Sequence, residues 1–405
     1  MGHMPIDTDV CVVGGGPAGL VHALLLARAG LRVTVLEKHP TFLRDFRGDT
    51  VHPSTLTLLD ELGLGERAQA LPHRKVYDLR ASFADGVYPV VSFEGLRTAH
   101  PYIMFVPQWD FLELIADAAA AYPTFTLLRE HEVTGLLRAD GVVRGVVARH
   151  GDERVEVRAR LTVAADGRNS AVRRELGWQP REYGAPMDVL WFRLPRRESD
   201  GSGLELKVAA GRLMILIDRG EYWQIAYIIP KGGYDAVVAA GLPAWRDSVA
   251  AITPMFADRI GEVTSWDQIA MLTVRVDRLT TWHAPGVLLI GDAAHAMSPI
   301  GGVGINLAVQ DAVAAARILA PPLIAGRLRE RDLAAVRRRR RFPTAGTQLV
   351  QRVLQRAILA PVLGATGPVA APFPLKVARR VPALRRIPAR FIGTGLRPEH
   401  APPAG

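Results

Sequence analysis

The chain has 405 residues, of which 49% are hydrophobic and 22% charged, a composition typical of a soluble globular enzyme with more than one structural unit. The single cysteine, Cys11, excludes an internal disulfide framework and a cysteine metal cluster, and we predict no metal site. The net charge of +10 comes largely from late arginine clusters, but aromatic residues do not alternate with them, so we expect no nucleic-acid partner.

The sequence also bears on the location of the protein. The N-terminal residues lack the charged and apolar pattern of a signal peptide, so we expect a cytoplasmic location. One uncharged stretch, residues 357–375, contains four prolines and two glycines that would break a spanning helix. We therefore predict an irregular, surface-packed tail there, no transmembrane segment, and at most weak peripheral membrane contact.

The first predicted elements form a βαβ unit. Residues 9–13 are an apolar run typical of a buried parallel strand, residues 17–29 have helical spacing, and residues 32–37 predict a second strand. The segment Gly14-Gly15-Gly16-Pro17-Ala18-Gly19 fits G-x-G-x-x-G, which lets the backbone approach a pyrophosphate at the helix N-terminus. Glu37 ends the second strand, where a carboxylate can accept hydrogen bonds from ribose hydroxyls. These features predict a dinucleotide site, and the glycine pattern occurs only once.

The middle of the chain changes character. Helices are predicted at residues 54–62 and 109–122, several short strands at 125–150, and a buried strand at 161–165. From about residue 184 to residue 280, strand-like segments dominate, with a hairpin at 218–221 and a helix at 244–257. A buried strand at 286–290, a helix at 304–319 and a helical, then Pro-rich, C-terminal part follow. The antiparallel segment is therefore expected to be inserted between halves of the nucleotide fold.

Two further motifs follow buried strands. The carboxylate of Asp292, in Gly291-Asp292, is placed to bond the ribityl chain of a flavin. The glycine-rich helix start from Pro299 to Asn306 would let a flat ring approach closely and would point a helix N-terminus at the charge that reduction creates. Asp166-Gly167 is the third element, although by itself it is equally a turn with a helix cap. Together the motifs indicate that the dinucleotide is FAD.

In this order and separation, the three elements resemble the class A flavoprotein monooxygenases, whose reference fold is that of para-hydroxybenzoate hydroxylase. The resemblance covers roughly Val10 to Leu319. It implies an α/β fold: a Rossmann-like FAD-binding domain of the GR2 type, an inserted antiparallel β-sheet substrate domain, and a helical C-terminal tail. We place the FAD-binding domain at residues 4–75, 103–183 and 281–327, the substrate domain at 76–102 and 184–280, and the Pro/Arg-rich tail at 328–405.

The resemblance also implies the chemistry and the residues that hold the cofactor. In this family NADH or NADPH binds transiently and reduces non-covalent FAD, and O₂ then gives a flavin C4a-hydroperoxide that hydroxylates an aromatic or polycyclic small molecule. The cofactor-binding residues implied are Gly14, Gly16, Pro17, Ala18, Gly19, Glu37, Lys38, Arg47, Gln108, Val133, Asp166, Asp292, Pro299, Gly302, Val303, Gly304, Ile305 and Asn306.

Catalytic and substrate-binding side chains carry weaker signals. Pro299 is placed beside the reactive edge of the flavin by resemblance, and His52 is a second catalytic candidate that could equally be a histidine bonded to backbone at a helix start. Candidate substrate-pocket residues on the inserted sheet are Trp191, Arg193, Met214, Ile215, Trp223 and Tyr227. Strand alternation allows only about half of them to face one cavity. A flavin-dependent reductase or dehydrogenase acting on a double bond is the alternative function, and a FAD-binding protein without turnover is a third.

Overall fold

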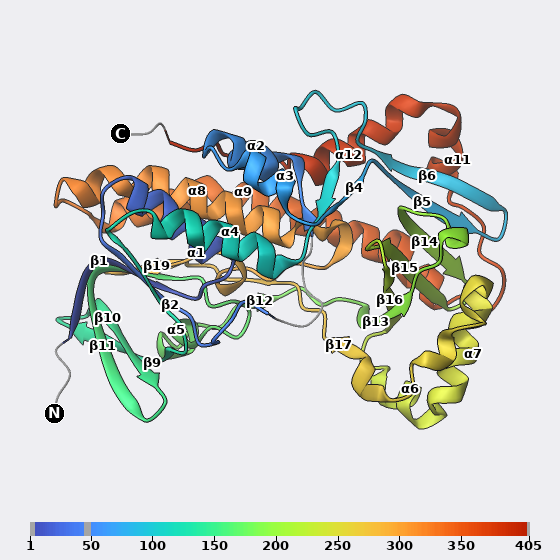
Figure 1. The fold of residues 1–405 in the computed structure, drawn as a ribbon, viewed down its shortest axis with the longest axis horizontal. Helices are drawn as coiled ribbons and strands as arrows, with labels where there is room; N and C mark the ends of the chain where they lie inside the picture. The colour runs from blue at the N-terminus through green and yellow to red at the C-terminus, as the bar shows by residue number, and fades with distance from the viewer. Residues whose placement is uncertain (1–4, 44–49, 403–405) are drawn as a thin grey trace.

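Two large sheets organise the computed structural model, which describes residues 5–43 and 50–402. Figure 1 shows them at opposite ends of the long axis, with long helices layered over the first sheet. The structure confirms the predicted α/β fold with an inserted antiparallel sheet and a helical C-terminus. Arg47 lies outside the described residues.

The first sheet carries the predicted nucleotide fold. Its strands run in the order β19-β20-β11-β1-β2-β8, and β9 and β10 extend it as a hairpin. The pairs β20–β11, β11–β1, β1–β2 and β2–β8 are parallel. Its strands are β1 (Ile6–Val13), β2 (Val33–Leu36), β8 (Phe125–Leu128), β9 (Glu132–Ala139), β10 (Val142–His150), β11 (Glu153–Ala164), β19 (His283–Ala284) and β20 (Val287–Leu289). Cys11 is fully buried in β1, and burial raises the pKa of its thiol, so this cysteine is inert.

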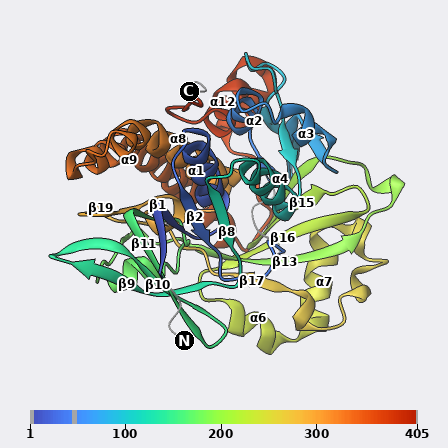
Figure 2. The ribbon, with the colours of Figure 1, turned by 60° about the vertical axis from the view of Figure 1, so that its left-hand side comes forward.

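Four long helices pack together on this sheet, and Figure 2 shows α1, α4, α8 and α9 on the same side of it. They are α1 (Pro17–Arg28), α4 (Gln108–Ala120), α8 (Val303–Ile324) and α9 (Glu330–Leu354), joined by the shorter α2 (Pro53–Glu61), α3 (Gly65–Ala70) and α5 (Ala171–Glu175). The stretch Ile300–Ile324 is long and apolar enough to cross a membrane, but 72% of its apolar window is buried inside the protein, as in a core helix. Peripheral membrane contact stays a prediction.

The second sheet is the inserted one. Its order is β17-β13-β16-β15-β14-β5-β6, antiparallel except for the pair β14–β5. Its strands are β5 (Asp78–Phe83), β6 (Gly86–Ser92), β13 (Met187–Pro195), β14 (Leu204–Ala209), β15 (Arg212–Asp218), β16 (Tyr222–Pro230) and β17 (Ala270–Leu272). Figures 1 and 2 both show α6 (Tyr234–Ala240) and α7 (Leu242–Ile252) against one face of this sheet. The helix expected at 244–257 ends earlier because Pro254 begins a separate 3₁₀ turn.

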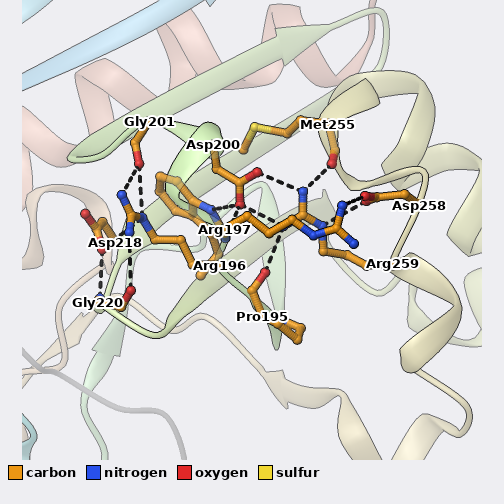
Figure 3. A network of polar contacts seen from close by, with 11 residues as sticks. Pro195, Arg196, Arg197, Asp200, Gly201, Asp218, Gly220, Met255, Asp258 and Arg259 are labelled. Carbon is orange, nitrogen blue, oxygen red and sulfur yellow. Dashed lines mark hydrogen bonds and ion pairs between the residues drawn. The ribbon is translucent and has the colours of Figure 1, made fainter.

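A polar network fixes the loop that follows β13, and Figure 3 shows it. Arg259 reaches both oxygens of Asp200, with N–O distances of 2.7 and 2.8 Å, and donates to the carbonyl of Pro195 at 3.1 Å. Both charged side chains are buried, each with 3% exposure. The network therefore ties the short turn η1 (Glu198–Asp200) to the segment between η2 (Pro254–Phe256) and η3 (Ile260–Glu262).

Smaller elements connect the sheets. One small sheet contains β3 (Thr50–Val51), β7 (Ile103–Phe105) and β4 (Arg74–Val76), and another pairs β12 (Arg181–Glu182) with β18 (Asp277–Arg278). The remaining 3₁₀ turns are η4 (Trp266–Gln268), η5 (Gly291–Ala293), η6 (Ile300–Gly302) and η8 (Pro382–Arg385).

The C-terminal part corrects one expectation. The stretch 357–375 was expected to be irregular, and residues 364–372 are, but at its start α9 continues through a π-helical turn, η7 (Gln355–Leu359), into α10 (Ala360–Leu363). Pro361 directly follows this π-helical turn, in which the N–H of Ala360 donates to the carbonyl of Gln355, so the i→i−4 hydrogen-bond pattern that a proline would break is already altered there. Helices α11 (Phe373–Arg380) and α12 (Arg386–Gly393) then pack against β6, as Figure 1 shows at the upper right.

Candidate active site

Three stretches far apart in the sequence form one surface. Gly14 lies so close to the end of β11 that a Cβ atom there would approach the carbonyl oxygen of Ala165 to 2.6 Å. A Cβ on Gly291 would lie 3.3 Å from Ala18 and 3.2 Å from Ala308. Both glycines have positive φ, +102° and +58°, which side chains disfavour. The N-terminal glycine loop, the Asp166 turn and the Gly291 turn therefore meet at the carboxyl ends of the parallel strands.

The start of α1 offers free backbone donors. Among the described residues, no side chain caps this helix at Gly16, and Pro17 occupies its first turn. A Cβ on Gly19 would overlap the carbonyl oxygen of Gly14, while one on Gly16 would meet nothing within 4 Å. Close packing on one side and open space on the other are what a phosphate at a helix N-terminus requires. Ala18 is buried beneath this turn.

Glu37 is oriented toward the glycine loop. Its side chain is buried, and its two oxygens accept hydrogen bonds from the backbone N–H of Gly15 at 2.8 Å and of His39 at 3.1 Å. Lys38 follows at the exposed surface. Farther away, Val133 is buried in β9, and Gln108 is the partly exposed first residue of α4.

Asp292 and Asp166 differ in how they are held. Asp292 follows β20, keeps a side-chain exposure of 30%, and pairs with Arg168 at 3.3 Å. One oxygen of Asp166 accepts from the N–H groups of Ala171 and Val172 and caps α5, as the turn interpretation allows. Its other oxygen is buried without a hydrogen-bond partner in the described part of the chain, and burial raises the pKa of this carboxyl. Asp292 thus keeps part of its carboxylate exposed, and Asp166 retains one unused acceptor.

The start of α8 is shaped by left-handed glycines. Gly301 and Gly302 have φ values of +77° and +64°, and no described side chain caps α8 at Gly302. A Cβ on Gly302 would lie 2.8 Å from the hydroxyl of Thr50, so this turn presses against β3. Gly304 has open space beside it, whereas Val303 is buried and Ile305 partly buried.

Hydrogen bonds to Asn306 connect α2 to α8. Its side-chain oxygen accepts hydrogen bonds from the hydroxyls of Ser54 at 2.7 Å and Thr55 at 2.8 Å. These hydroxyls orient the amide group at the first turn of the helix. A role for Asn306 toward the cofactor stays a prediction.

His52 is fully buried. Its ring contacts the carbonyl oxygen of Ile392 at 2.8 Å and the hydroxyl of Thr50 at 3.3 Å. Burial lowers the pKa of His52 to about 4, against the smaller opposite effect of backbone hydrogen bonds. The imidazole is neutral at pH 7, and this geometry matches a histidine bonded to backbone, so its catalytic role stays a prediction.

The six candidate substrate-pocket residues separate onto two faces of the inserted sheet. Met214, Trp223 and Tyr227 point to the face covered by α7, where they share a core with Trp245. Trp191 and Ile215 point to the other face and pack against the same hydrophobic cluster as Ile300, which follows Pro299 in the chain. Arg193 is exposed and shares this second face, because it is two residues from Trp191 along β13. Only the second set can line a pocket that borders the start of α8.

The comparisons with known proteins agree with this geometry. Residues 7–352 match the family described as FAD binding domain. The chain belongs to this family. It is a FAD-dependent monooxygenase, and NAD(P)H and O₂ are the typical electron donor and co-substrate of such enzymes.

The enzyme is 35% identical to 6-methylpretetramide 4-monooxygenase of Streptomyces rimosus, over 95% of this chain and 92% of that protein. It superimposes on the anhydrotetracycline hydroxylase OxyS of Streptomyces rimosus with a TM-score of 0.75 and 27% identity, covering 99% of this chain and 78% of that one. p-Nitrophenol 4-monooxygenase of Pseudomonas putida shares the fold, with a TM-score of 0.78, 21% identity, and coverage of 97% and 100%.

The residues fit the cofactor that the family binds. Two helix N-termini without side-chain caps, the open space over Gly16 and the part-exposed carboxylate of Asp292 form a surface suited to the phosphates and hydroxyls of FAD.

Sequence reasoning missed a row of buried glutamines in the enzyme. Gln348, Gln351 and Gln355 are spaced three and four residues apart and are all buried on one side of α9 and η7. Gln351 donates to the carbonyls of Ser298 and Ile300, both at 2.9 Å, and Gln355 donates to the hydroxyl of Ser298 at 3.0 Å. They hold the turn that contains Pro299. The helical spacing of the three glutamines was a visible signal.

A buried ion network behind the Gly291 turn was also missed. Asp311 accepts from the N–H of Gly291 at 3.2 Å, contacts His295 at 2.6 Å and pairs with Arg340 at 2.8 Å. Arg340 also reaches Glu399 at 3.4 Å. Burial alone would raise the pKa of Asp311, but His295 and Arg340 outweigh burial and lower it. The carboxylate therefore stays ionised at the back of the cofactor site.

Proposed function

We propose that the enzyme hydroxylates a polycyclic phenol. We also propose that the substrate lies between the start of α8 and the inner face of the inserted sheet, which is the face that carries Trp191 and Ile215. The support from relatives is that the protein 35% identical to this chain is named 6-methylpretetramide 4-monooxygenase, and that the structure 27% identical is an anhydrotetracycline hydroxylase. Both names describe polycyclic substrates.

The observation that carries the proposal is a pair of unused polar atoms on the inner face. The indole nitrogen of Trp191 and the amide oxygen of Gln224 are buried without hydrogen-bond partners in the described part of the chain. Gln224 lies opposite Arg193 in the β13–β16 ladder, so it shares a face with Arg193 and Trp191. A buried donor and acceptor without partners are costly, and a ligand that satisfies both recovers that cost.

The chemistry of these groups matches a phenolic ring system. The indole N–H can donate to a carbonyl or phenolate oxygen, and the Gln224 oxygen can accept from a hydroxyl. Ile215 and Ile300 pack against the same hydrophobic cluster as Trp191, and their apolar side chains suit fused rings and the exclusion of water. FAD, when bound, supplies the activation of oxygen. The residues of this chain orient the ring, keep the site dry and fix the turn around Pro299.

The test measures NAD(P)H oxidation and product formation by the FAD-loaded enzyme with 6-methylpretetramide and with p-nitrophenol as the single-ring comparison. We expect the polycyclic compound to stimulate oxidation and to gain one oxygen atom. Trp191→Phe and Gln224→Leu should each raise the KM for it about tenfold, the cost of one lost hydrogen bond to a buried group. Anaerobic turnover without oxygen gain would support a reductase instead, and a preference for p-nitrophenol would contradict the polycyclic class.

A further inference from the structure

A cavity lies outside the surface formed by the flavin motifs. It has a volume of about 230 Å³ and lies between the loop 183–186, which leads into β13, and the junction of α9 with η7. Arg352, Gln355 and Arg356 line it from the helix side, and Tyr183 lines it from the loop. Gln355 is the residue that bonds Ser298, so the cavity adjoins the turn that contains Pro299.

Two arginines, Arg352 and Arg356, line the cavity. The guanidinium group of Arg352 lies 4.9 Å from the ring centroid of Tyr183, and those of Arg181 and Arg278, outside the lining, lie 5.5 and 5.3 Å from it. None of the described residues that line the cavity is acidic. The Nε of Arg352 is buried and has no hydrogen-bond partner in the described part of the chain. An arginine N–H without a partner beside an aromatic ring suits a phosphate carried on a nucleotide.

The helix geometry is unusual at the same place. The cavity is lined by η7, where the helix widens into a π-helical turn that begins at Gln355. Such turns are rare and occur frequently at functional sites. Arg352 and Arg356 flank the start of this turn and both face the cavity. Two guanidinium groups on one helix can then act on one anion.

We propose that this cavity binds a phosphate group of the reduced pyridine nucleotide. The inference rests on the proposed function only in that the enzyme consumes NADH or NADPH. The sequence contains a single G-x-G-x-x-G loop, which FAD occupies, so the donor needs another site for its phosphates. The hydrogen bond from Gln355 to Ser298 connects the cavity to the turn that contains Pro299, and this turn is predicted to border the cofactor.

The experiment measures binding directly on the FAD-loaded enzyme. ADP-ribose and 2′-phospho-ADP-ribose, which cannot reduce a flavin, are titrated by calorimetry into wild type, Arg352→Gln and Arg356→Gln. We expect each variant to bind at least one probe about tenfold more weakly, as loss of a charged hydrogen bond predicts. Weaker binding of both probes would show that the cavity holds the diphosphate. Weaker binding of the 2′-phosphorylated probe alone would show that it holds the 2′-phosphate.

The control is Arg327→Gln. Arg327 lies in a smaller cleft of about 160 Å³ that also holds several arginines but includes Asp332, and this variant should bind both probes as wild type does. Arg352→Lys, which keeps the charge, should recover part of the affinity. Unchanged affinity for both probes in both glutamine variants overturns the proposal.

A further measurement separates this inference from the proposed function. Enzyme reduced with dithionite and then given oxygen and substrate needs no nucleotide, so the arginine variants should form product in one turnover as wild type does. In steady state the KM for NAD(P)H should rise with kcat nearly unchanged. Absence of product from chemically reduced wild type would count against the proposed function, whereas an unchanged KM would count against the cavity.

Discussion

Two buried ion networks stabilise the enzyme in different ways. The cofactor-side network consists of Asp311, His295, Arg340 and Glu399, and the sheet-side network consists of Asp200, Arg259 and Asp258 (Figure 3). In each, a nearly inaccessible arginine pairs with a nearly inaccessible aspartate, with exposures of 1% and 0% in the first and 3% and 3% in the second. Chemically, the two central pairs are alike.

Their connections differ. The cofactor-side network joins α8, α9, the segment around Glu399 and, through the N–H of Gly291, the turn that positions Asp292. The sheet-side network joins two loops of the inserted sheet and reaches no predicted cofactor residue. The same kind of ion pair therefore connects to a turn predicted to hold the cofactor in the first network, and only to neighbouring loops in the second.

The largest effect is expected from Arg340→Met. This change leaves Asp311 and Glu399 buried without their shared partner, and we expect a loss of about 3 to 5 kcal/mol in the free energy of unfolding. Because Asp311 also holds the Gly291 turn, the purified protein should lose bound flavin, measured by its visible absorbance relative to protein. Arg338→Met, on the exposed side of α9, should change neither quantity.

Asp292→Ala sharpens this prediction. It removes the carboxylate next to the turn without touching the network, so it should lose most of the flavin while the free energy of unfolding of the cofactor-free protein stays near that of wild type. Asp152→Ala, at an exposed turn, is its matched control. Retention of flavin by Arg340→Met would show that the network does not support the cofactor site.

Arg259→Met should have a smaller effect. Burying Asp200 without its bidentate partner is expected to cost about 3 kcal/mol of unfolding free energy, with flavin content unchanged. Arg197→Met provides the control, because Arg197 and Asp258 pair at the exposed surface, where an ion pair contributes at most about 1 kcal/mol. Loss of flavin in Arg259→Met would remove the distinction between the two networks.

The smallest effect concerns acid stability. The hydrogen bond from Arg259 lowers the pKa of Asp200 from 3.8 to about 2. Because the folded pKa lies below the unfolded one, this stabilisation is complete above pH 4 and is lost as the pH falls toward 2. The difference in unfolding free energy between wild type and Arg259→Met should therefore shrink over that range. Chemical denaturation at a series of pH values measures it, and a constant difference would contradict the prediction.

The parts predicted well from sequence depend on local patterns. The unit β1-α1-β2 was readable because apolar runs, Gly14 and Glu37 all lie within one short segment. The order of the three motifs identified the family for a similar reason, since each motif sits at the end of a strand.

The parts that could not be predicted depend on partners far apart in the chain. Nothing near Arg340 indicates that it pairs with Asp311 and Glu399, because the packing of α8 against α9 brings it to Asp311 and the return of the segment after α12 brings Glu399 to it. The choice between Trp191 and Trp223 as pocket residues needed the register of the sheet, since a shift of one residue exchanges the two faces. The start of the stretch 357–375 was misjudged at Pro361, because the π-helical turn before it could not be read from the sequence.

Glu399 connects the segment after α12 to the two long helices of the first sheet. Its carboxylate accepts from Arg317, Arg339 and Arg340, and its backbone N–H donates to Gln310, so the last described segment closes the back of the cofactor helix. The segment around Glu399 therefore belongs to the same folded unit as α8 and α9, and a truncation that removes it would leave Gln310 and three arginines without this shared partner.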